Sequence, residues 1–257
     1  MPRDHVRIAS YNTHGGVGRD RHFVPKRIAD VLNELDVDVI ALQEVENRAT
    51  GFDMLEYLAA ETGFHAIAGP TLMRRGADYG NGLLTRFKSL SAKRVDLCVE
   101  RCEPRGAIDA ELDCGGAPMR VLATHLGLRP YERRDQIQRL LAVLEGDRPL
   151  PTILMGDINE WFLWGRPLRW MHRHFQQTPS PPTFPSIFPV FALDRMWVKP
   201  RSLLRGVRVH STALAKIASD HLPLTAELAL RCGGGAAGSR SDEEGVMKKS
   251  DEVRVMR

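Results

Sequence analysis

Residues 119–157, MRVLATHLGLRPYERRDQIQRLLAVLEGDRPLPTILMGD, decide the fold because they hold a strand, a helix and a second strand in succession. The runs at both ends are short, apolar and nearly continuous, which is typical of buried strands. Between them, residues 130–146 show helical periodicity, with a proline suited to the first turn. Apolar residues of this helix recur on one face: Ile137, Leu140, Leu141 and Leu144. The stretch predicts two parallel strands joined by a helix.

The same order of elements occurs near the N-terminus. Residues 6–11 (VRIASY) predict a strand, residues 24–35 an amphipathic helix, and residues 37–45 (VDVIALQEV) a strand buried on both faces. Further strand candidates lie near residues 81–86, 93–99, 105–113, 193–199 and 224–230. Two strand-rich halves with helices outside them indicate an α/β sandwich of two packed sheets.

Length and composition suggest one large domain. The chain has 257 residues, 43% of them hydrophobic, and we expect a domain at residues 1–231 followed by a disordered tail at residues 232–257. No apolar run approaches the roughly 18 residues of a bilayer-spanning helix, and the first ten residues lack a secretory signal pattern. Four cysteines without CxxC spacing suggest neither a disulfide framework nor a zinc ribbon, so we expect a cytoplasmic protein. The net charge of +4 is weak support for an anionic partner.

Polar side chains follow four of the predicted strands. In the first unit they are residues 11–14 (YNTH) and 43–44 (QE), and in the second unit residues 124–125 (TH) and 157–159 (DIN). Any one of these strand ends is also typical of a turn. Because strands joined through a helix run parallel, however, their ends share one sheet edge, where α/β proteins bind ligands. Together with residues 218–224 (ASDHLPL), they predict a site rich in metal-ligating and proton-transferring groups.

Seven short motifs give the chain a resemblance to a known superfamily. In order, they are SYNTHGG (10–16), LQEVE (42–46), YGNGLLTR (79–86), ATHLGL (123–128), GDINE (156–160), LDRMWV (193–198) and SDHLPL (219–224). The set resembles the endonuclease/exonuclease/phosphatase superfamily, which includes deoxyribonuclease I, exonuclease III and neutral sphingomyelinase. The chain looks most similar to its small bacterial members. The resemblance implies a four-layer αββα sandwich of two mixed sheets and divalent-metal-dependent cleavage of phosphoester bonds.

The resemblance also implies a metal site. Glu44 would be the main ligand of Mg²⁺, with Mn²⁺ as an alternative ion. Asn12 would be its neighbour at the metal, and Asp220 would lie nearby. Mg²⁺ prefers hard oxygen ligands and keeps several waters, so one or two carboxylates are enough to hold it beside a substrate.

Five further residues match the catalytic positions of the superfamily. Asp157 would position or deprotonate the attacking water, and Asn159 would hold a phosphate oxygen. His221, oriented by Asp194, and His125 would face the phosphate, because protonated histidines stabilise the charge that develops on its oxygens. A carboxylate partner favours the charged imidazole, which is a reason to pair Asp194 with His221.

Three other polar residues are candidates for substrate binding, each with a structural alternative. His14 contacts substrate or belongs to a turn. Asn81 contacts substrate or lies in a turn that enters a strand. Arg105 meets phosphate or is a solvated surface residue. Glu160 follows the GDIN motif and is interpreted as an ordinary loop acid.

Residues 161–191 separate two of the motifs and are expected to overhang the site. Leu168, Met171 and Phe175 recur at helical spacing, and the prolines that follow favour an extended loop. One interpretation is a surface helix with a rigid loop, and the other is a basic, aromatic rim for an anionic substrate. Its tryptophans suit both stacking on bases and the level of lipid headgroups. No segment resembles the hydrophobic hairpin of membrane sphingomyelinases.

The resemblance implies a metal-dependent phosphodiester hydrolase, and three hypotheses stay open. The first is an enzyme that acts on lipid headgroups or other small phosphodiesters, and the second is an endo- or exonuclease on DNA or RNA. The third, a non-catalytic binding module, predicts the loss of one or more site residues. All of these residues are present: Glu44, Asp157, Asn159, Asp220 and His221. We expect a monomer without a transmembrane segment.

Overall fold

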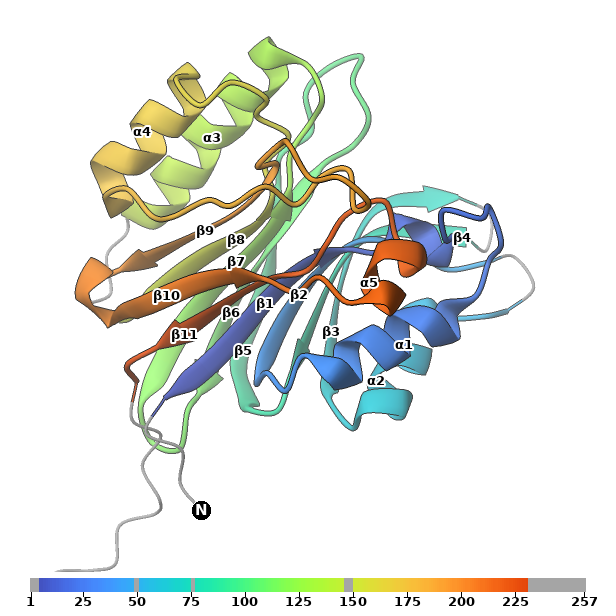
Figure 1. Ribbon diagram of the computed structural model, residues 1–257. Coiled ribbons are helices and arrows are strands. Elements are labelled where there is room, and N and C mark those ends of the chain that lie inside the picture. Colours follow the sequence, from blue (N-terminus) through green and yellow to red (C-terminus); the bar gives the residue numbers. More distant parts are fainter. Residues whose placement is uncertain (1–4, 49–50, 75–76, 146–149, 231–257) are drawn as a thin grey trace, which may run out of the picture.

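Two β-sheets pack face to face, and helices cover the outer face of each sheet (Figure 1). This arrangement comes from a computed structural model that describes residues 5–48, 51–74, 77–145 and 150–230. The layers follow in the order helix, sheet, sheet, helix, so the predicted four-layer αββα sandwich is confirmed. The end of the domain at residue 231 and the tail at 232–257 lie outside the described residues.

The first sheet has six strands in the order β10-β11-β1-β2-β4-β3. Their bounds are β1 Val6–Asn12, β2 Val39–Glu46, β3 His65–Arg74, β4 Ala77–Thr85, β10 Leu204–Val209 and β11 Leu224–Leu228. β1 and β2 run parallel, as the strand–helix–strand pattern predicts, whereas β1 and β11 run antiparallel. The sheet is therefore mixed.

The second sheet has five strands in the order β5-β6-β7-β8-β9. Their bounds are β5 Lys88–Asp96, β6 Gly106–Asp113, β7 Pro118–His125, β8 Thr152–Asp157 and β9 Asp194–Lys199. β7 and β8 are the parallel pair predicted from residues 119–157, and the other neighbours are antiparallel. β5 begins earlier than the predicted strand at 93–99, because its mostly exposed side chains give no apolar alternation.

Five α-helices of the described residues form the two outer layers. α1 Pro25–Glu34, α2 Met54–Thr62 and α5 Ala213–Ala218 pack on the first sheet, and α3 Pro130–Glu145 and α4 Arg166–Phe175 pack on the second. Two short 3₁₀ helices lie at His14–Gly16 (η1) and Arg201–Leu203 (η2). The predicted inner faces of α3 and α4 are buried, except that Leu141 of α3 is only partly buried. No helix in the described ranges is both long and apolar enough to cross a bilayer.

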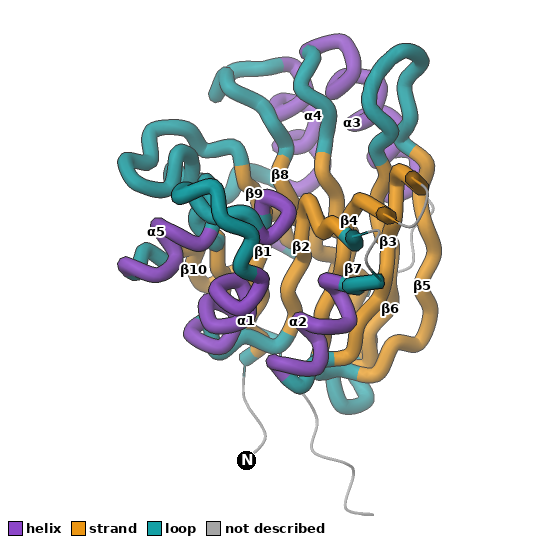
Figure 2. Tube along the Cα trace, turned by 90° about the vertical axis from the view of Figure 1, so that its right-hand side faces the viewer, coloured by secondary structure: helices purple, strands orange, loops and turns teal. Residues whose placement is uncertain are grey.

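Apolar side chains from both sheets fill the space between them. The first sheet contributes Ile8 and Leu83, and the second contributes Val121 and Met155, all fully buried. Burial of a side chain of this size contributes roughly 1.5–3 kcal/mol. The apolar filling fixes the spacing of the sheets, so polar residues at the strand ends meet beyond it. Figure 2 shows long loops that extend past the upper end of the sheets.

Several elements were missed by the sequence patterns: α2, β3, β10 and α5. α2 had a readable signal, because Asp53 caps it by accepting a hydrogen bond from the Glu56 backbone N–H and Gly63 ends it with φ of +70°. Residues 184–191 form a loop between α4 and β9. Phe184 and Phe191 pair there as an antiparallel bridge, and the segment between them exposes apolar side chains.

Gly156 lets β8 approach β7 closely. A Cβ atom at this position would lie 1.8 Å from the carbonyl oxygen of Thr124, which no side chain can occupy. Only glycine therefore permits this pairing, and it does so one residue before Asp157. In sequence, Gly156 suggests a turn. In the structure it lies in β8 and fixes the position of this strand beside β7, and with it the position of the Asp157 carboxylate.

Candidate active site

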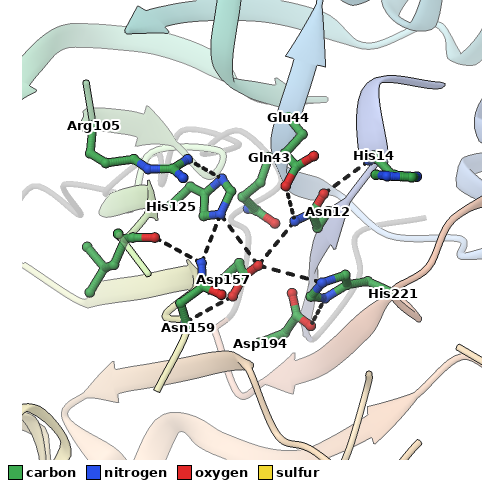
Figure 3. Close-up of polar contacts among 12 residues, drawn as sticks. Asn12, His14, Gln43, Glu44, Arg105, His125, Asp157, Asn159, Asp194 and His221 are labelled. Atoms are coloured by element: carbon green, nitrogen blue, oxygen red, sulfur yellow. Dashed lines mark hydrogen bonds and ion pairs between the residues drawn. The ribbon is translucent and has the colours of Figure 1, made fainter. Parts of the chain in front are cut away.

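Strand register brings three polar residues of the second sheet together (Figure 3). His125 on β7 is opposite Asp157 on β8, and Asp157 is opposite Asp194 on β9. All three side chains are buried, and His125 Nε2 lies 3.5 Å from Asp157 Oδ2. Parallel pairing of β7 with β8 thus places the two strand ends side by side, where the sequence expects a site.

Asn12 links this group to the first sheet (Figure 3). Its Nδ2 donates to Glu44 Oε1 at 3.0 Å and to Asp157 Oδ2 at 3.1 Å. Its Oδ1 accepts a hydrogen bond from the His14 backbone N–H at 3.0 Å. One amide therefore joins carboxylates that come from different sheets, across the interface between them.

Glu44 stands at an irregularity in β2. The pairing of β2 with β4 shifts between Leu42 and Val45, and Glu44 has a φ of +55°. Bulges of this kind re-aim side chains beside active sites. The bulge turns the Glu44 carboxylate toward Asn12, whose amide nitrogen donates to both Glu44 and Asp157. The carboxylate oxygens of Glu44 are of the kind that a hard divalent cation prefers. Glu44 and Asn12 are the residues that could hold it.

His221 is held by a carboxylate on each side. Its Nδ1 lies 2.8 Å from Asp194 Oδ2, and its Nε2 lies 3.8 Å from Asp157 Oδ2. The Thr183 hydroxyl also donates to Asp194 Oδ2, at 2.5 Å, and the ring of Phe184 lies 4.8 Å from the imidazole between centroids. The imidazole is therefore fixed in direction, with Nε2 toward the site.

The trio Asp157, Asp194 and His221 offers ligand atoms within 4.8 Å of one another, a spacing that a metal could also use. Asp194 Oδ2, however, already accepts hydrogen bonds from the imidazole and from a threonine hydroxyl. We interpret the trio as a buried ion-pair network, because the hydrogen bonds of Asp194 and His221 already use the atoms that would bind a metal.

The surroundings of Asp157 and His221 shift the pKa values of both side chains. Burial raises the pKa of Asp157 to about 6, although the positive charge of His221 opposes this. Burial alone would lower the pKa of His221, but the carboxylates of Asp194 and Asp157 outweigh it and raise the pKa to about 10. A carboxylate poised near neutrality can accept a proton, while a cationic imidazole can stabilise negative charge beside it.

His125 has different surroundings. Arg105 Nη1 lies 3.0 Å from His125 Nδ1, and Asn159 Nδ2 lies 3.1 Å from His125 Nε2. Both neighbours are donors, and a protonated imidazole has no lone pair to accept from either. Burial lowers the pKa of His125 well below its usual value, and Arg105 and His221 lower it further. The expectation of protonated histidines therefore fits His221 but not His125.

The three candidate substrate residues lie in different places. Arg105 is buried against His125, so its interpretation as a solvated surface residue is wrong. Asn81 is also buried, and its Nδ2 donates to the Gly106 carbonyl at 2.9 Å, which joins β4 to β6. His14 is exposed in η1, with Nδ1 2.9 Å from the Val17 carbonyl oxygen. Arg105 is thus the one of the three whose side chain contacts the buried cluster.

Asn159 and Asp220 complete the predicted set. Asn159 has a φ of +53°, and its backbone N–H donates to Asp157 Oδ1 at 3.0 Å. Its Nδ2 also donates to the Leu126 carbonyl at 2.9 Å. Asp220 is half-buried beside His221, and its Oδ1 accepts from the Ser219 hydroxyl at 3.4 Å. Among the hydrogen bonds of the described residues, none joins Asp220 to Glu44 or Asn12.

Two supporting residues were missed by the sequence patterns. The Ser219 hydroxyl donates to the Asn12 carbonyl at 2.8 Å and accepts from the His221 backbone N–H at 3.2 Å, so it ties the SDH motif to β1. Glu160 is buried, and Arg133 Nε donates to its Oε2 at 3.3 Å. The interpretation of Glu160 as an ordinary loop acid is therefore wrong, because its partner on α3 is distant in sequence.

The chain is similar to several known proteins. The uncharacterized protein YbhP of Escherichia coli K12 is 26% identical over 245 residues, which span 87% of this chain and 96% of that protein. An endonuclease/exonuclease/phosphatase from Beutenbergia cavernae is similar in structure, with a TM-score of 0.75, 24% identity, and coverage of 92% of this chain and 74% of that one.

A functionally unknown conserved protein from Enterococcus faecalis is similar as well, with a TM-score of 0.71, 21% identity, and coverage of 86% of this chain and 98% of that one. At these identities the two solved structures support the fold. The family model for the endonuclease/exonuclease/phosphatase family matches residues 9–221, which hold the whole candidate site. This chain belongs to the endonuclease/exonuclease/phosphatase family.

Proposed function

We propose that this protein hydrolyses phosphodiesters of lipid headgroups or other small diesters by attack of water on phosphorus. The observation that carries the proposal is the position of Asp157 between Asn12, His125 and His221. A buried carboxylate with a pKa near 6 is suited to accept a proton at neutral pH. Family membership supports a hydrolase that acts on phosphoesters, and the diester preference is ours.

Each side chain has a role that follows from its contacts. Asp157 orients the attacking water and accepts its proton. His221, held in the cationic form by Asp194, donates from Nε2 to a phosphoryl oxygen as negative charge develops there. Asn159 and the neutral His125 lie on the opposite side of Asp157 and position the phosphate group. A charged and a neutral imidazole thus divide the work of binding and stabilisation.

A divalent ion would bind at Glu44 and Asn12, with Asp220 nearby. We propose Mg²⁺, with Mn²⁺ as an alternative, because carboxylate and amide oxygens suit both ions. Such an ion, when bound, neutralises phosphate charge and lowers the pKa of a coordinated water. A monomeric state and a cytoplasmic location are further proposals that rest on sequence alone.

The test is an assay of the purified protein with Mg²⁺ or Mn²⁺ on several substrates. They are bis-(p-nitrophenyl) phosphate, p-nitrophenyl phosphate, plasmid DNA, RNA and phospholipid vesicles. We expect turnover of the diester and the lipid, abolished by EDTA and by the variants Asp157→Asn and His221→Ala. Activity on plasmid or RNA but not on lipid would favour the nuclease hypothesis. Absence of metal-dependent turnover on every substrate would support a binding module and overturn the proposal.

A further inference from the structure

Two loops beside the candidate active site end in exposed apolar side chains. The first loop, residues 158–165, exposes a consecutive run whose members are more than half exposed: Phe162, Leu163 and Trp164. The second loop, residues 184–191, exposes a similar group: Ile187, Phe188 and Val190. Clusters of this kind on a protein surface mark sites of interaction with a protein or a membrane. We name these six residues the apolar tips.

The two loops share an aromatic base that reaches the active site. The ring of Trp161 lies 4.8 Å from that of Phe191 and 6.0 Å from that of Phe184, measured between centroids. Phe184 in turn lies 4.8 Å from the imidazole of His221. A continuous aromatic path therefore leads from the cationic histidine to the apolar tips.

Bonds beneath the tips hold both loops in place. In the first loop, Glu160 Oε1 accepts a hydrogen bond from the Phe162 backbone N–H at 3.2 Å, and the carboxylate is fixed by Arg133. In the second loop, the Ser186 hydroxyl donates to the Ser219 carbonyl at 2.8 Å, next to the SDH motif. These hydrogen bonds hold the lower part of each loop against the protein, so the apolar tips project into solvent.

The stretch of sequence that carries the tips has basic but no acidic side chains. Residues 161–193 contain no aspartate or glutamate and include Arg166, Arg169 and Arg173, all exposed on α4. Arg166 directly follows the first loop. Apolar side chains beside arginines match an anionic bilayer, where the former enter the headgroup boundary and the latter meet lipid phosphates. Three of the six tips, Leu163, Ile187 and Val190, have no ring to stack on bases, whereas all six can enter the headgroup boundary, which favours a bilayer over single-stranded nucleic acid.

We propose that the apolar tips dock this protein on the surface of an anionic phospholipid bilayer. The inference rests on the proposed function and narrows its substrate class to lipid phosphodiesters. Docked in this way, the aromatic base at Trp161 and Phe184 lies between the bilayer and His221. The docked bilayer then lies beside the entrance to the site, so a headgroup phosphodiester at its surface is presented to His221 and Asp157.

Vesicle sedimentation tests the docking. The full chain is mixed with vesicles of phosphatidylcholine alone or of phosphatidylcholine with phosphatidylglycerol. We expect binding to the mixed vesicles, lowered at least about tenfold in the triple variant Leu163→Ser, Trp164→Ser, Phe188→Ser. Arg166→Glu should remove the preference for phosphatidylglycerol. Leu90→Ser is the matched control, because this half-exposed leucine lies on the edge strand β5.

Turnover of bis-(p-nitrophenyl) phosphate separates this inference from the proposed function. The triple variant should keep this soluble activity and lose hydrolysis of vesicle lipid. Wild-type turnover without vesicle binding would overturn the docking alone, and vesicle binding without any turnover would overturn the proposed function alone. Equal vesicle binding by the triple variant would also overturn the docking. The docking would also be overturned if the wild type does not bind vesicles but instead forms a dimer or a complex with DNA that the triple variant does not form.

Discussion

Arg105 Nη1 lies 3.0 Å from His125 Nδ1 in the interior of the protein, so a permanent positive charge adjoins one of the two site histidines. The other histidine, His221, adjoins two carboxylates instead. The two imidazoles lie on either side of Asp157, yet their pKa values move in opposite directions. Their neighbours, which are far away in sequence, assign them different protonation states.

Replacement of Arg105 by methionine should raise the pKa of His125, because a positive charge that opposes protonation is lost. Burial continues to lower this pKa, so we expect a partial rise. NMR titration of the imidazole Cε1–H signals measures it directly, with His210, whose Nε2 lies 2.7 Å from Glu34 Oε2, as a control. An unchanged His125 titration in the variant would contradict the proposed coupling. Turnover should fall by about tenfold or more if Arg105 helps to hold phosphate.

Replacement of Asp194 by asparagine should lower the pKa of His221, since the largest source of its charge stabilisation is removed and burial remains. In the wild type, His221 stays cationic until pH approaches about 10, so turnover should persist on the alkaline side. In the variant, the alkaline limb of the pH–rate profile should move to lower pH, with a loss of about a hundredfold at pH 8. Identical alkaline limbs would show that His221 does not act as a cation.

The same substitution carries a stability signature. The pKa of His221 is raised from 6.5 to about 10 on folding, so its contribution to stability is fully present below pH 6.5 and is lost as pH rises through about 10. Thermal denaturation of the wild type should therefore show a falling Tm across this window. Asp194→Asn should flatten that fall, which distinguishes loss of the ion pair from general damage.

Replacement of Asp157 by asparagine should abolish turnover without loss of stability. Removal of a general base costs about 10²–10⁴ in rate. Because the pKa of Asp157 is raised to about 6 in the fold, its ionisation opposes folding at pH 7, and a neutral amide removes that opposition. We expect an equal or higher Tm at pH 7, measured by calorimetry beside kcat. A large drop in Tm would mean that the carboxylate is structural.

Replacement of Gly156 by alanine should destabilise the protein and displace Asp157. The added Cβ would lie 1.8 Å from the Thr124 carbonyl oxygen, so β8 must move away from β7. Overpacking of this kind costs about 1–3 kcal/mol, measurable by urea denaturation. Gly206→Ala is the matched control, because a Cβ there meets nothing within 4 Å. Equal effects of the two substitutions would contradict the role of Gly156.

Replacement of Glu44 by glutamine should remove metal binding while the fold persists. An ion that binds only the folded state raises the free energy of unfolding with the logarithm of its concentration over Kd, by about 2.7 kcal/mol at a hundredfold excess, and so raises the Tm. We expect Mg²⁺ or Mn²⁺ to raise the Tm of the wild type and EDTA to reverse it. Glu44→Gln should show no such rise, whereas the matched variant Glu46→Gln should keep it. A rise in both variants would place the metal elsewhere.

The fold was predictable where local pattern and topology agree. The apolar periodicity of residues 119–157 predicts a strand, a helix and a second strand. Two strands joined in this way run parallel, so they end at the same edge of the sheet. His125 and Asp157 are register partners for that reason. β5 lacked any such pattern, because an edge strand with mostly exposed side chains has no apolar face to repeat.

The contacts between side chains were not predictable in the same way. Arginine and glutamate usually lie on the protein surface, but Arg105 and Glu160 are both buried. Each contacts a partner on another element. The lowered pKa of His125 comes from burial first and then from Arg105, which directly precedes β6 and lies twenty residues earlier in the chain. Charge states of this kind follow from the assembled fold and leave no local trace in sequence.

The bond from Asn12 to Asp157 has a consequence for how activity can arise at all. The proposed metal ligands Glu44 and Asn12 belong to one sheet and the proposed base Asp157 belongs to the other, so neither sheet alone carries the complete proposed site. We therefore expect that a nascent or partly unfolded chain does not hydrolyse phosphoesters until the two sheets have packed together. Turnover in such a molecule is a direct report of completed assembly.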